Sequence, residues 1–245
     1  IRVMPSETVR FVARPDGMTR IETKLRLDGP MPDGFVRGLD LPVQARWNGG
    51  SGFVLNPECA PVRFTVLKAG AMELGANSLR LCPVDGGVLV SRGGRLGGGA
   101  RIDAPRLEGR MGDTRLRLAA RSADYRMGSG RFSLAGVSMH LGGDKEPVLL
   151  SADSLDGGTV QGGMGGNASG ITARIGTVPL LVRDGEAAWS YSDGVLGLNG
   201  PIIVYDDANP DRFHPLQSPD FLLRLANGRI DAAGSLRVPG RERTI

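Results

Sequence analysis

The sequence predicts an all-β protein with little helix, built as a long antiparallel sheet of repeated hairpins. One pattern of apolar, any, apolar, any, any, Gly, any, apolar residues occurs over 125–132, 189–196 and 223–230. Alternating apolar residues mark a strand with one buried face, and the Gly supplies the positive-φ corner of a tight turn. A composition with 38 Gly and 40% hydrophobic residues suits turn-rich strands and is too apolar for a disordered chain.

Further strands are expected wherever apolar and polar residues alternate. These segments are 20–27, 41–47, 62–66, 115–118 and 171–175. Such alternation is typical of antiparallel strands that are wet on one face. Turn clusters at 15–17, 28–30, 48–50 and 85–87 separate the strands. Residues 67–79 could hold a short turn, and the two glycines in this segment weigh against a helix.

The Gly-rich stretch 157–170 reads as a flexible loop that divides the chain. We therefore expect a first sheet segment over 1–156, the loop over 157–170, and a second segment over 171–245. The second segment is expected to continue the first, so that the chain forms a single elongated domain.

Charge and hydropathy limit the classes of partner. The net charge of +4 is spread along the polar strand faces, which argues against a nucleic-acid groove and permits a mild attraction to anionic membranes. No apolar run approaches the roughly 18 residues of a membrane span, and no secretory signal is present. Because the chain starts at Ile1 without an initiator Met, we expect it to be a segment of a longer protein.

The usual signatures of catalysis and cofactor binding are missing, so we expect no enzyme, no cofactor and no metal. The sequence has no nucleophile elbow, phosphate loop or zinc-protease helix. Its two histidines, His140 and His214, are far apart, and ordinary strand or loop positions account for both. The acidic loop 206–211 imitates the start of a calcium loop, but Arg212 and Ser218 replace the Gly and Glu such a loop needs. A solvated turn is the ordinary interpretation.

The two cysteines are predicted to form a disulfide between Cys59 and Cys82. Strand parity places both on the face opposite Phe64 and Leu81. Pairing the two strands antiparallel, with the cysteines opposite each other, also brings apolar residues opposite apolar residues. Directly opposed residues lie within disulfide reach. A bridge fits an oxidising compartment.

The dry strand faces are aliphatic, and aromatic residues make up only 5% of the chain. Such faces can form the core of a β-sandwich or line a channel for acyl chains. The alternation does not separate these two structures, and taken alone it favours the sandwich core.

Four motifs follow one another in the C-terminal half: 173–182, 189–198, 211–216 and 225–236. Together they resemble the C-terminal part of YdbH-type proteins of Gram-negative bacteria, which belong to the AsmA-like superfamily that includes TamB and YhdP. The segments 56–59 and 79–83 are similar in style to alphaproteobacterial members.

The resemblance implies a long β-sheet curved into an open, taco-like apolar groove. It also implies a periplasmic protein of the cell envelope, anchored in the inner membrane by an N-terminal helix that this segment lacks. The expected function is to conduct phospholipid between the inner and outer membranes. Its partners would be phospholipid acyl chains and possible proteins of either membrane.

The dry-face residues would then line the lipid groove. They are Leu25, Leu27, Val43, Phe64, Val66, Leu116, Leu118, Leu223 and Leu225. One alternative is a TamB-type module for outer-membrane biogenesis that acts through exposed strand edges. Another is a β-sandwich or β-helical surface protein without a lipid role.

Overall fold

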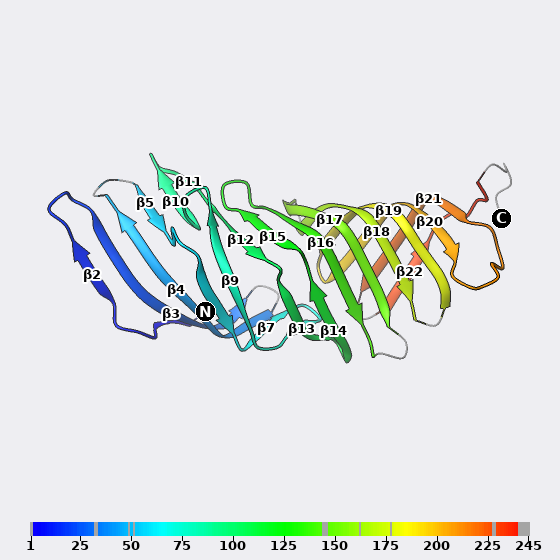
Figure 1. Ribbon diagram of the computed structural model, residues 1–245, viewed down its shortest axis with the longest axis horizontal. Helices are drawn as coiled ribbons and strands as arrows, with labels where there is room; N and C mark the ends of the chain where they lie inside the picture. The colour runs from blue at the N-terminus through cyan, green and yellow to red at the C-terminus, as the bar shows by residue number, and fades with distance from the viewer. Residues whose placement is uncertain are drawn as a thin grey trace. The chain divides into compact units, whose positions relative to one another are not determined.

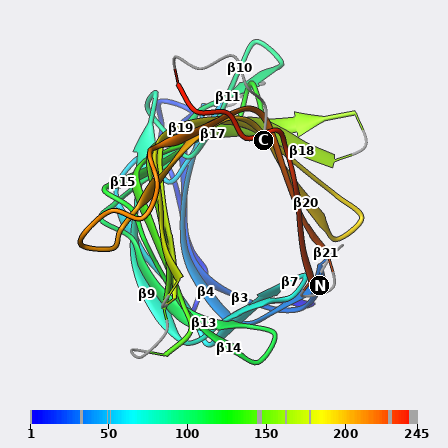
Figure 2. The ribbon, with the colours of Figure 1, turned by 90° about the vertical axis from the view of Figure 1, so that its right-hand side faces the viewer.

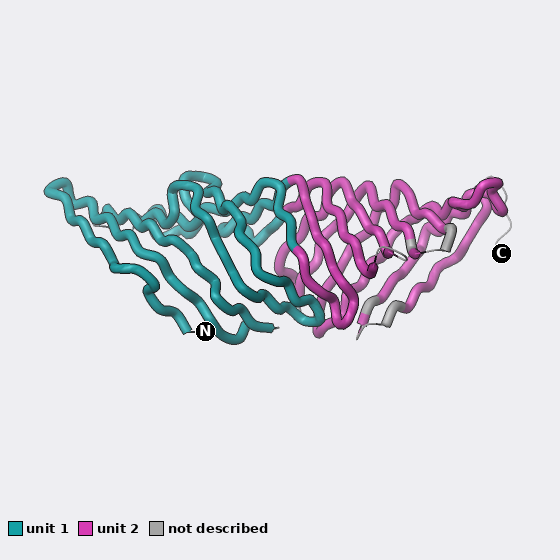
Figure 3. Tube along the Cα trace, turned by 60° about the horizontal axis from the view of Figure 1, so that its bottom comes forward, with its two compact units in different colours: residues 1–107, 122–132 teal, residues 108–121, 133–245 magenta. Residues whose placement is uncertain are grey.

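The computed structural model describes residues 2–31, 34–48, 50, 52–143, 147–161, 163–176, 178–226 and 229–239. These residues form twenty-two strands and no helix. The strands belong to one large antiparallel sheet (Figure 1), so the all-β prediction is confirmed. The chain divides into two compact units, which Figure 3 distinguishes by colour. Unit 1 comprises residues 1–107 and 122–132, and unit 2 comprises 108–121 and 133–245.

Unit 1 is built around two long paired strands, β3 and β4, which lie side by side in Figure 1. Its strands are β1 (Arg2–Pro5), β2 (Arg10–Ala13), β3 (Thr19–Met31), β4 (Gly34–Trp47), β5 (Phe53–Leu55), β6 (Ala60–Phe64), β7 (Val66–Ala69), β8 (Met72–Leu74), β9 (Asn77–Val84), β10 (Leu89–Arg92), β11 (Arg95–Gly97), β12 (Gly99–Asp103) and β15 (Ser122–Arg126). Residues 67–79 therefore hold strands and turns.

Unit 2 is a succession of long hairpins whose strands curve rather than run straight (Figure 2). Its strands are β14 (Thr114–Ala119), β17 (Val148–Val160), β18 (Gly163–Ile175), β19 (Val178–Ser192), β20 (Val195–Asp206), β21 (Leu216–Ala226) and β22 (Arg229–Ala233). β13 (Arg106–Met111) and β16 (Arg131–Leu141) contribute residues to both units. The predicted hairpins over 189–196 and 223–230 are β19/β20 and β21/β22.

The prediction of a loop over 157–170 is wrong, because residues 157–160 and 163–170 belong to the paired strands β17 and β18. Glycine is required here by close strand approach rather than by flexibility. A Cβ on Gly166 would clash with the carbonyl oxygen of Asp156 on the neighbouring strand. The chain divides at 107/108, 121/122 and 132/133 instead, so the predicted segments 1–156 and 171–245 do not match the two units.

Bulges bend the strands of unit 2 at neighbouring positions. The register shifts lie between Ala168 and Ile171 in β18, between 183 and 188 in β19, and between 200 and 202 in β20. A bulge adds one residue to one strand, which bends that strand and strengthens its twist. Because the bulges are aligned, the sheet of unit 2 bends along a line that crosses its strands. β3 and β4 of unit 1 also shift register between Leu27 and Gly29, where β4 contains the extra residue between Val36 and Leu39. The predicted turn at 28–30 therefore lies inside β3, opposite a bulge of β4.

Gly170 shows why the bend needs particular residues. Its φ is 61°, and a Cβ there would clash with the carboxylate of Asp153. We expect Gly170→Ala to lower the free energy of unfolding by about 2 kcal/mol, since a side chain at positive φ is strained before the clash is counted. Urea unfolding measures this change. Gly97→Ala is the matched control, because its Cβ would meet open space at an ordinary φ. Equal effects of the two substitutions would contradict the assignment of Gly170 to the bend.

Cys59 and Cys82 are joined by a disulfide in unit 1, with their Cα atoms 4.0 Å apart. The flanking pairs are Ala60 with Leu81 and Val62 with Leu79, which is the register that the sequence predicts. The bridge therefore lies at one end of the β6–β9 pair and fixes the register of those two strands.

Candidate functional site: the apolar sheet faces

One face of the unit 2 sheet is apolar along the whole length of its strands. Residues that are paired across neighbouring antiparallel strands lie on the same face. The unit 2 apolar face consists of Leu150, Leu155, Ala168, Ile171, Ala173, Val182, Trp189, Tyr191, Leu196, Leu198, Ile202, Val204, Leu216 and Leu223. Chains of direct pairs cross the sheet, as in Ala173, Val182, Val204 and Leu216.

The bend keeps this face continuous. Val182 has an even number and Trp189 an odd one, so a strand without a bulge would place them on opposite faces. The extra residue of β19 between 183 and 188 restores them to one face. At the bend itself, a Cβ on Gly185 would lie 3.2 Å from Cβ of Ile171 and 3.7 Å from Cγ2 of Ile202. Ile171 and Ile202 therefore lie close together at Gly185, and apolar side chains continue across the bend.

Trp189 is the largest side chain of this face. It pairs with Gly166 on one side and Leu198 on the other. Its indole Nε1 donates a 2.9 Å hydrogen bond to the carbonyl oxygen of Asp156, two strands away. The ring therefore extends past Gly166 toward β17 and covers the part of the face where the glycines provide no side chain.

Most of the unit 2 apolar face is only half-buried. Ala168 at 6% exposure and Ile202 at 9%, both next to the bend, are its fully buried members. On the Trp189 side of the bend the opposite face is polar and exposed, as Glu186 and Ser190 in β19 and Asn199 in β20 illustrate. Leu222, which is 47% exposed, is an apolar exception there. Beyond the bend, the opposite face also carries Leu181, Ile203 and Tyr205, which are half-buried. Unit 2 thus presents an apolar face that its own side chains do not fully cover.

Unit 1 has an apolar face of the same kind. The unit 1 apolar face consists of Ile21, Leu25, Leu27, Val36, Leu39, Leu41, Val43, Val62, Phe64, Leu67, Leu74, Leu79, Leu81 and Ile102. Arg63 pairs with Asp40 on the opposite face. Val62 and Phe64 of β6 therefore lie on the same face as Leu39 and Leu41 of β4. The buried members are Val36, Phe64 and Leu74, at 3%, 7% and 2% exposure.

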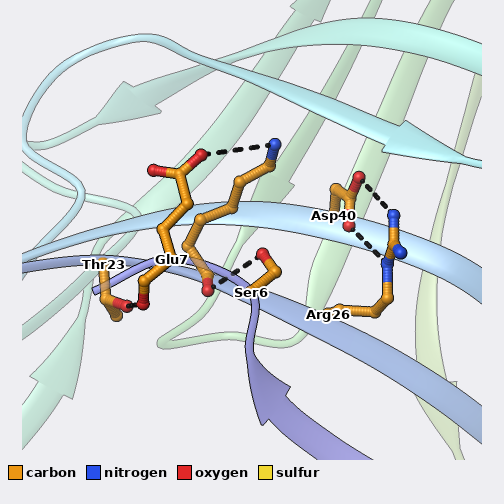
Figure 4. A network of polar contacts seen from close by, with 6 residues as sticks. Ser6, Glu7, Thr23, Arg26 and Asp40 are labelled. Carbon is orange, nitrogen blue, oxygen red and sulfur yellow. Dashed lines mark hydrogen bonds and ion pairs between the residues drawn. The ribbon is translucent and has the colours of Figure 1, made fainter. Parts of the chain in front are cut away.

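The opposite face of unit 1 is held by ion pairs and hydrogen bonds (Figure 4). Arg26 donates two hydrogen bonds to Asp40, of 2.9 and 3.0 Å. These bonds hold the pKa of the Asp40 carboxyl below its usual range. Lys24 lies 3.7 Å from Glu7 in the segment that joins β1 to β2. Charged pairs therefore occupy the wet face of β3 and β4, which leaves the other face to apolar side chains.

The total accessible surface agrees with this description. The chain exposes 15258 Å². A compact protein of its mass, 25.8 kDa, would expose about 10,500 Å², and two compact proteins of half that mass about 12,600 Å² together. The excess means that the chain encloses less of its surface than one compact protein, or two compact proteins of half its mass, would enclose.

Five of the nine predicted groove residues are half-buried, and four of them, all except Leu118, are members of the unit 1 or unit 2 apolar face. Leu25, Leu27 and Val43 belong to unit 1, and Leu118 and Leu223 to unit 2. Leu118 pairs with Met139 in β16. The backbone of Leu225 lies in β21, and its side chain is outside the described part of the chain.

Phe64, Leu116 and Val66 differ from that expectation. Phe64 and Leu116 are buried, at 7% and 0% exposure, so neither offers open apolar surface to a ligand. The placement of Val66 on the dry face is wrong. A break at Thr65 separates β6 from β7, and Val66 pairs with Arg37 while Leu67 pairs with Val36. The break shifts the parity by one residue, so Leu67 takes the position predicted for Val66.

The prediction left out Trp189, Leu198, Ile202 and Val204, all members of the unit 2 apolar face. Their alternation was visible in the hairpin pattern. The signal that was overlooked is the pair Asp184-Gly185, because an Asp-Gly pair inside a strand indicates a bulge as well as a turn. The bulge changes which residues of β19 face the apolar side.

The acidic loop after β20 is closed by an arginine. Arg212 donates two side-chain hydrogen bonds, of 2.9 and 3.0 Å, to the carboxylate of Asp206, whose side chain is fully buried. The backbone amides of Ala208 and Arg212 donate two more. Asp207 is paired with Arg174 at 2.6 Å. Among the described residues there is no group of three or more His, Cys, Asp or Glu that could hold a metal ion, and no helix long and apolar enough to cross a membrane.

Asp206 should make stability depend on acid. The hydrogen bonds from the Arg212 side chain, followed by the backbone amides, lower the pKa of its carboxyl far below the usual value. A carboxyl whose pKa is lowered in the folded state stabilises the fold at pH values above its unfolded pKa of about 3.9. This stabilisation is lost as the pH falls below that value toward the folded-state pKa. We expect the free energy of unfolding to fall between pH 5 and pH 2 more steeply in the wild type than in Asp206→Asn. Urea unfolding across this range measures the slopes, and equal slopes would contradict the expectation.

No protein-family model, no curated protein and no solved structure matches this chain.

Proposed function

We propose that this chain is a periplasmic, lipid-conducting β-groove segment that moves phospholipid between the inner and outer membranes. The observation that carries the proposal is the apolar face of each unit, which is only half-buried although it is lined by aliphatic and aromatic side chains. A soluble domain normally encloses such residues, and an uncovered apolar surface marks a binding site.

The physical gain for an acyl chain is large enough to matter. Each CH₂ group removed from water contributes about 0.8 kcal/mol. In unit 2 the apolar rows follow one another along the strands, from Leu196 through Leu198 to Ile202 and Val204 in β20. An acyl chain that moves from one row to the next leaves one apolar contact only as it gains another. The polar headgroup would stay in water at the open side.

Two further observations support a periplasmic location. A disulfide joins Cys59 and Cys82, and disulfides persist in oxidising compartments. The sequence also resembles YdbH-type proteins of the AsmA-like superfamily, for which an inner-membrane anchor and an envelope function are expected. The proposal gives the chain no catalytic residue, cofactor or metal.

One observation favours the alternative of an interaction module for outer-membrane assembly. All residues of β1 and β2 are exposed, among them Phe11 at 64% and Val12 at 54%. An exposed edge strand can accept a strand from a partner. This alternative uses the edge of unit 1 and makes no use of the apolar faces, so the two functions respond to different substitutions.

Extraction of the purified protein with organic solvent, followed by lipid mass spectrometry, tests the proposal. We expect phospholipid to co-purify with the wild type and to be lost in Leu198→Asp. Asn199→Asp is the matched control, because Asn199 is the next residue of β20 and lies on the polar face. A wild-type protein that carries no lipid and takes none from vesicles would contradict the proposed function.

A further inference from the structure

Unit 1 contains a cavity of about 620 Å³ at the ends of β4, β5 and β10, where Trp47 continues the row of Leu41 and Val43 along β4. Figure 1 shows these three strands at the same end of the unit. The cavity is lined by Met18, Arg46, Trp47, Phe53, Ser91 and Arg92, among others. Its volume lies within the range of about 300 to 1,000 Å³ that is usual for small-molecule sites.

The cavity combines residues from both faces of the sheet. Trp47 pairs with Phe53, which in turn pairs with Ser91. Arg46 is the neighbour of Trp47 along β4 and therefore lies on the opposite face, beside Val54. Aromatic side chains and a guanidinium group therefore line the same cavity at these strand ends.

The aromatic wall is accessible. Trp47 is 49% exposed and Met18 39%. The indole Nε1 of Trp47 donates a 2.6 Å hydrogen bond to the carbonyl oxygen of Gly50, which fixes the ring at the mouth of the cavity. Exposed tryptophans with one polar and one apolar side are enriched where protein meets the lipid–water interface.

The two arginines differ in how strongly they are held. Arg46 lies 3.1 Å from Glu58, whose side chain is 62% exposed, and such surface pairs contribute little. Arg92 makes no ion pair with any residue in the described part of the chain, and it is exposed. A guanidinium matches the geometry of a phosphate group, to which it donates two parallel hydrogen bonds.

We propose that this cavity binds the phosphate headgroup of an anionic phospholipid, with Arg92 and Arg46 on the phosphate and Trp47, Phe53 and Met18 against the glycerol and upper acyl chain. The inference rests on the proposed function and names its substrate class. The cavity would favour phosphatidylglycerol over zwitterionic phosphatidylcholine, because only the former leaves its negative charge uncompensated.

Binding of the whole protein to vesicles tests this inference. The probes are vesicles of phosphatidylcholine alone and of phosphatidylcholine mixed with phosphatidylglycerol. Tryptophan emission follows the binding, with Trp47→Phe as the blank. We expect the wild type to bind the mixed vesicles about tenfold more tightly, as one charge-assisted contact to phosphate allows. Arg92→Gln should remove most of this preference.

Arg95→Gln is the matched control, because Arg95 pairs with Arg92 across the β10–β11 hairpin and does not line the cavity. An equal loss in both variants would show a general charge effect and would overturn the site. Inorganic phosphate distinguishes a free-anion site from a lipid site. We expect it to leave the preference intact, and full displacement by phosphate at low concentration would overturn the lipid assignment.

The failure of this inference and the failure of the proposed function give different results. If Arg92→Gln keeps its preference while lipid still co-purifies with the protein, the headgroup site is wrong and the groove stands. If the wild type takes up neither lipid, the proposed function fails and the headgroup site fails with it.

Discussion

Leu223→Asp is expected to reduce lipid transfer by about a hundredfold while the protein stays folded. Leu223 lies on the unit 2 apolar face between Leu198 and Ala232 and is half-buried. An acyl chain that passes this position would have to desolvate an unpaired carboxylate, at a cost of about 3 kcal/mol, which slows a rate by about a hundredfold. A fluorescent-phospholipid transfer assay between two vesicle populations measures the rate.

The neighbouring residue provides the control. Leu222 has the same side chain in the same strand, but it is 47% exposed on the polar face. Leu222→Asp should leave transfer within about twofold of the wild type, since an exposed carboxylate stays hydrated. Both variants should unfold close to the wild type, because neither side chain is enclosed in a core. Equal transfer rates for the two variants would contradict the assignment of faces, and unfolding of Leu223→Asp alone would indicate a closed sandwich core.

Removal of the disulfide is expected to have the largest effect on stability. Cys59 and Cys82 are separated by 23 residues. Closing a loop of this length in the unfolded chain stabilises the native state by about 3 kcal/mol. The double variant Cys59→Ser, Cys82→Ser should therefore unfold at a clearly lower urea concentration.

Reduced wild-type protein is the matched comparison, and it should unfold together with the double variant. The slope of unfolding against urea is expected to rise slightly, because the unbridged denatured chain exposes more surface. Two reactive thiols in the unfolded, unreduced wild type would show that the disulfide is absent. That result would also remove one of the reasons for placing the protein in the periplasm.

Much of the fold follows from local pattern. The alternation in 20–27 and 41–47 predicts β3 and β4, and the apolar pairs that join Ile21 to Ala45 and Leu27 to Leu39 follow from it. The spacing of residues 189–196 predicts the β19/β20 hairpin. The register around the disulfide also follows from parity, because a shift by one residue would turn the apolar set of one strand to the other face.

The bends could not be predicted from alternation. A glycine such as Gly170 or a pair such as Asp184-Gly185 has the same sequence signal in a bulge and in a turn. Only the register of neighbouring strands separates the two, as the shifts in β18 and β19 do. For the same reason the parity of Val66 was assigned to the wrong face, since the break at Thr65 depends on contacts with β4.

The division into two units and the β17/β18 hairpin also could not be predicted from the sequence. Composition alone suggests that a Gly-rich stretch is flexible. In the structure, Gly157 and Gly166 are paired strand residues, and the indole of Trp189 extends past Gly166 to the carbonyl of Asp156. The partner that makes these glycines suitable for a strand is more than twenty residues away in the sequence, which local pattern does not record.

A photocrosslinking scan along β19 tests the central claim most directly. Benzoylphenylalanine is placed singly at residues 186 to 191, and the purified protein is irradiated with phospholipid vesicles. Residues of alternating parity face opposite sides of a strand. We expect lipid adducts at Ala187, Trp189 and Tyr191, on the apolar face, and none at Glu186, Ala188 and Ser190. Adducts at neither set, or equally at both, would contradict a lipid groove on this face.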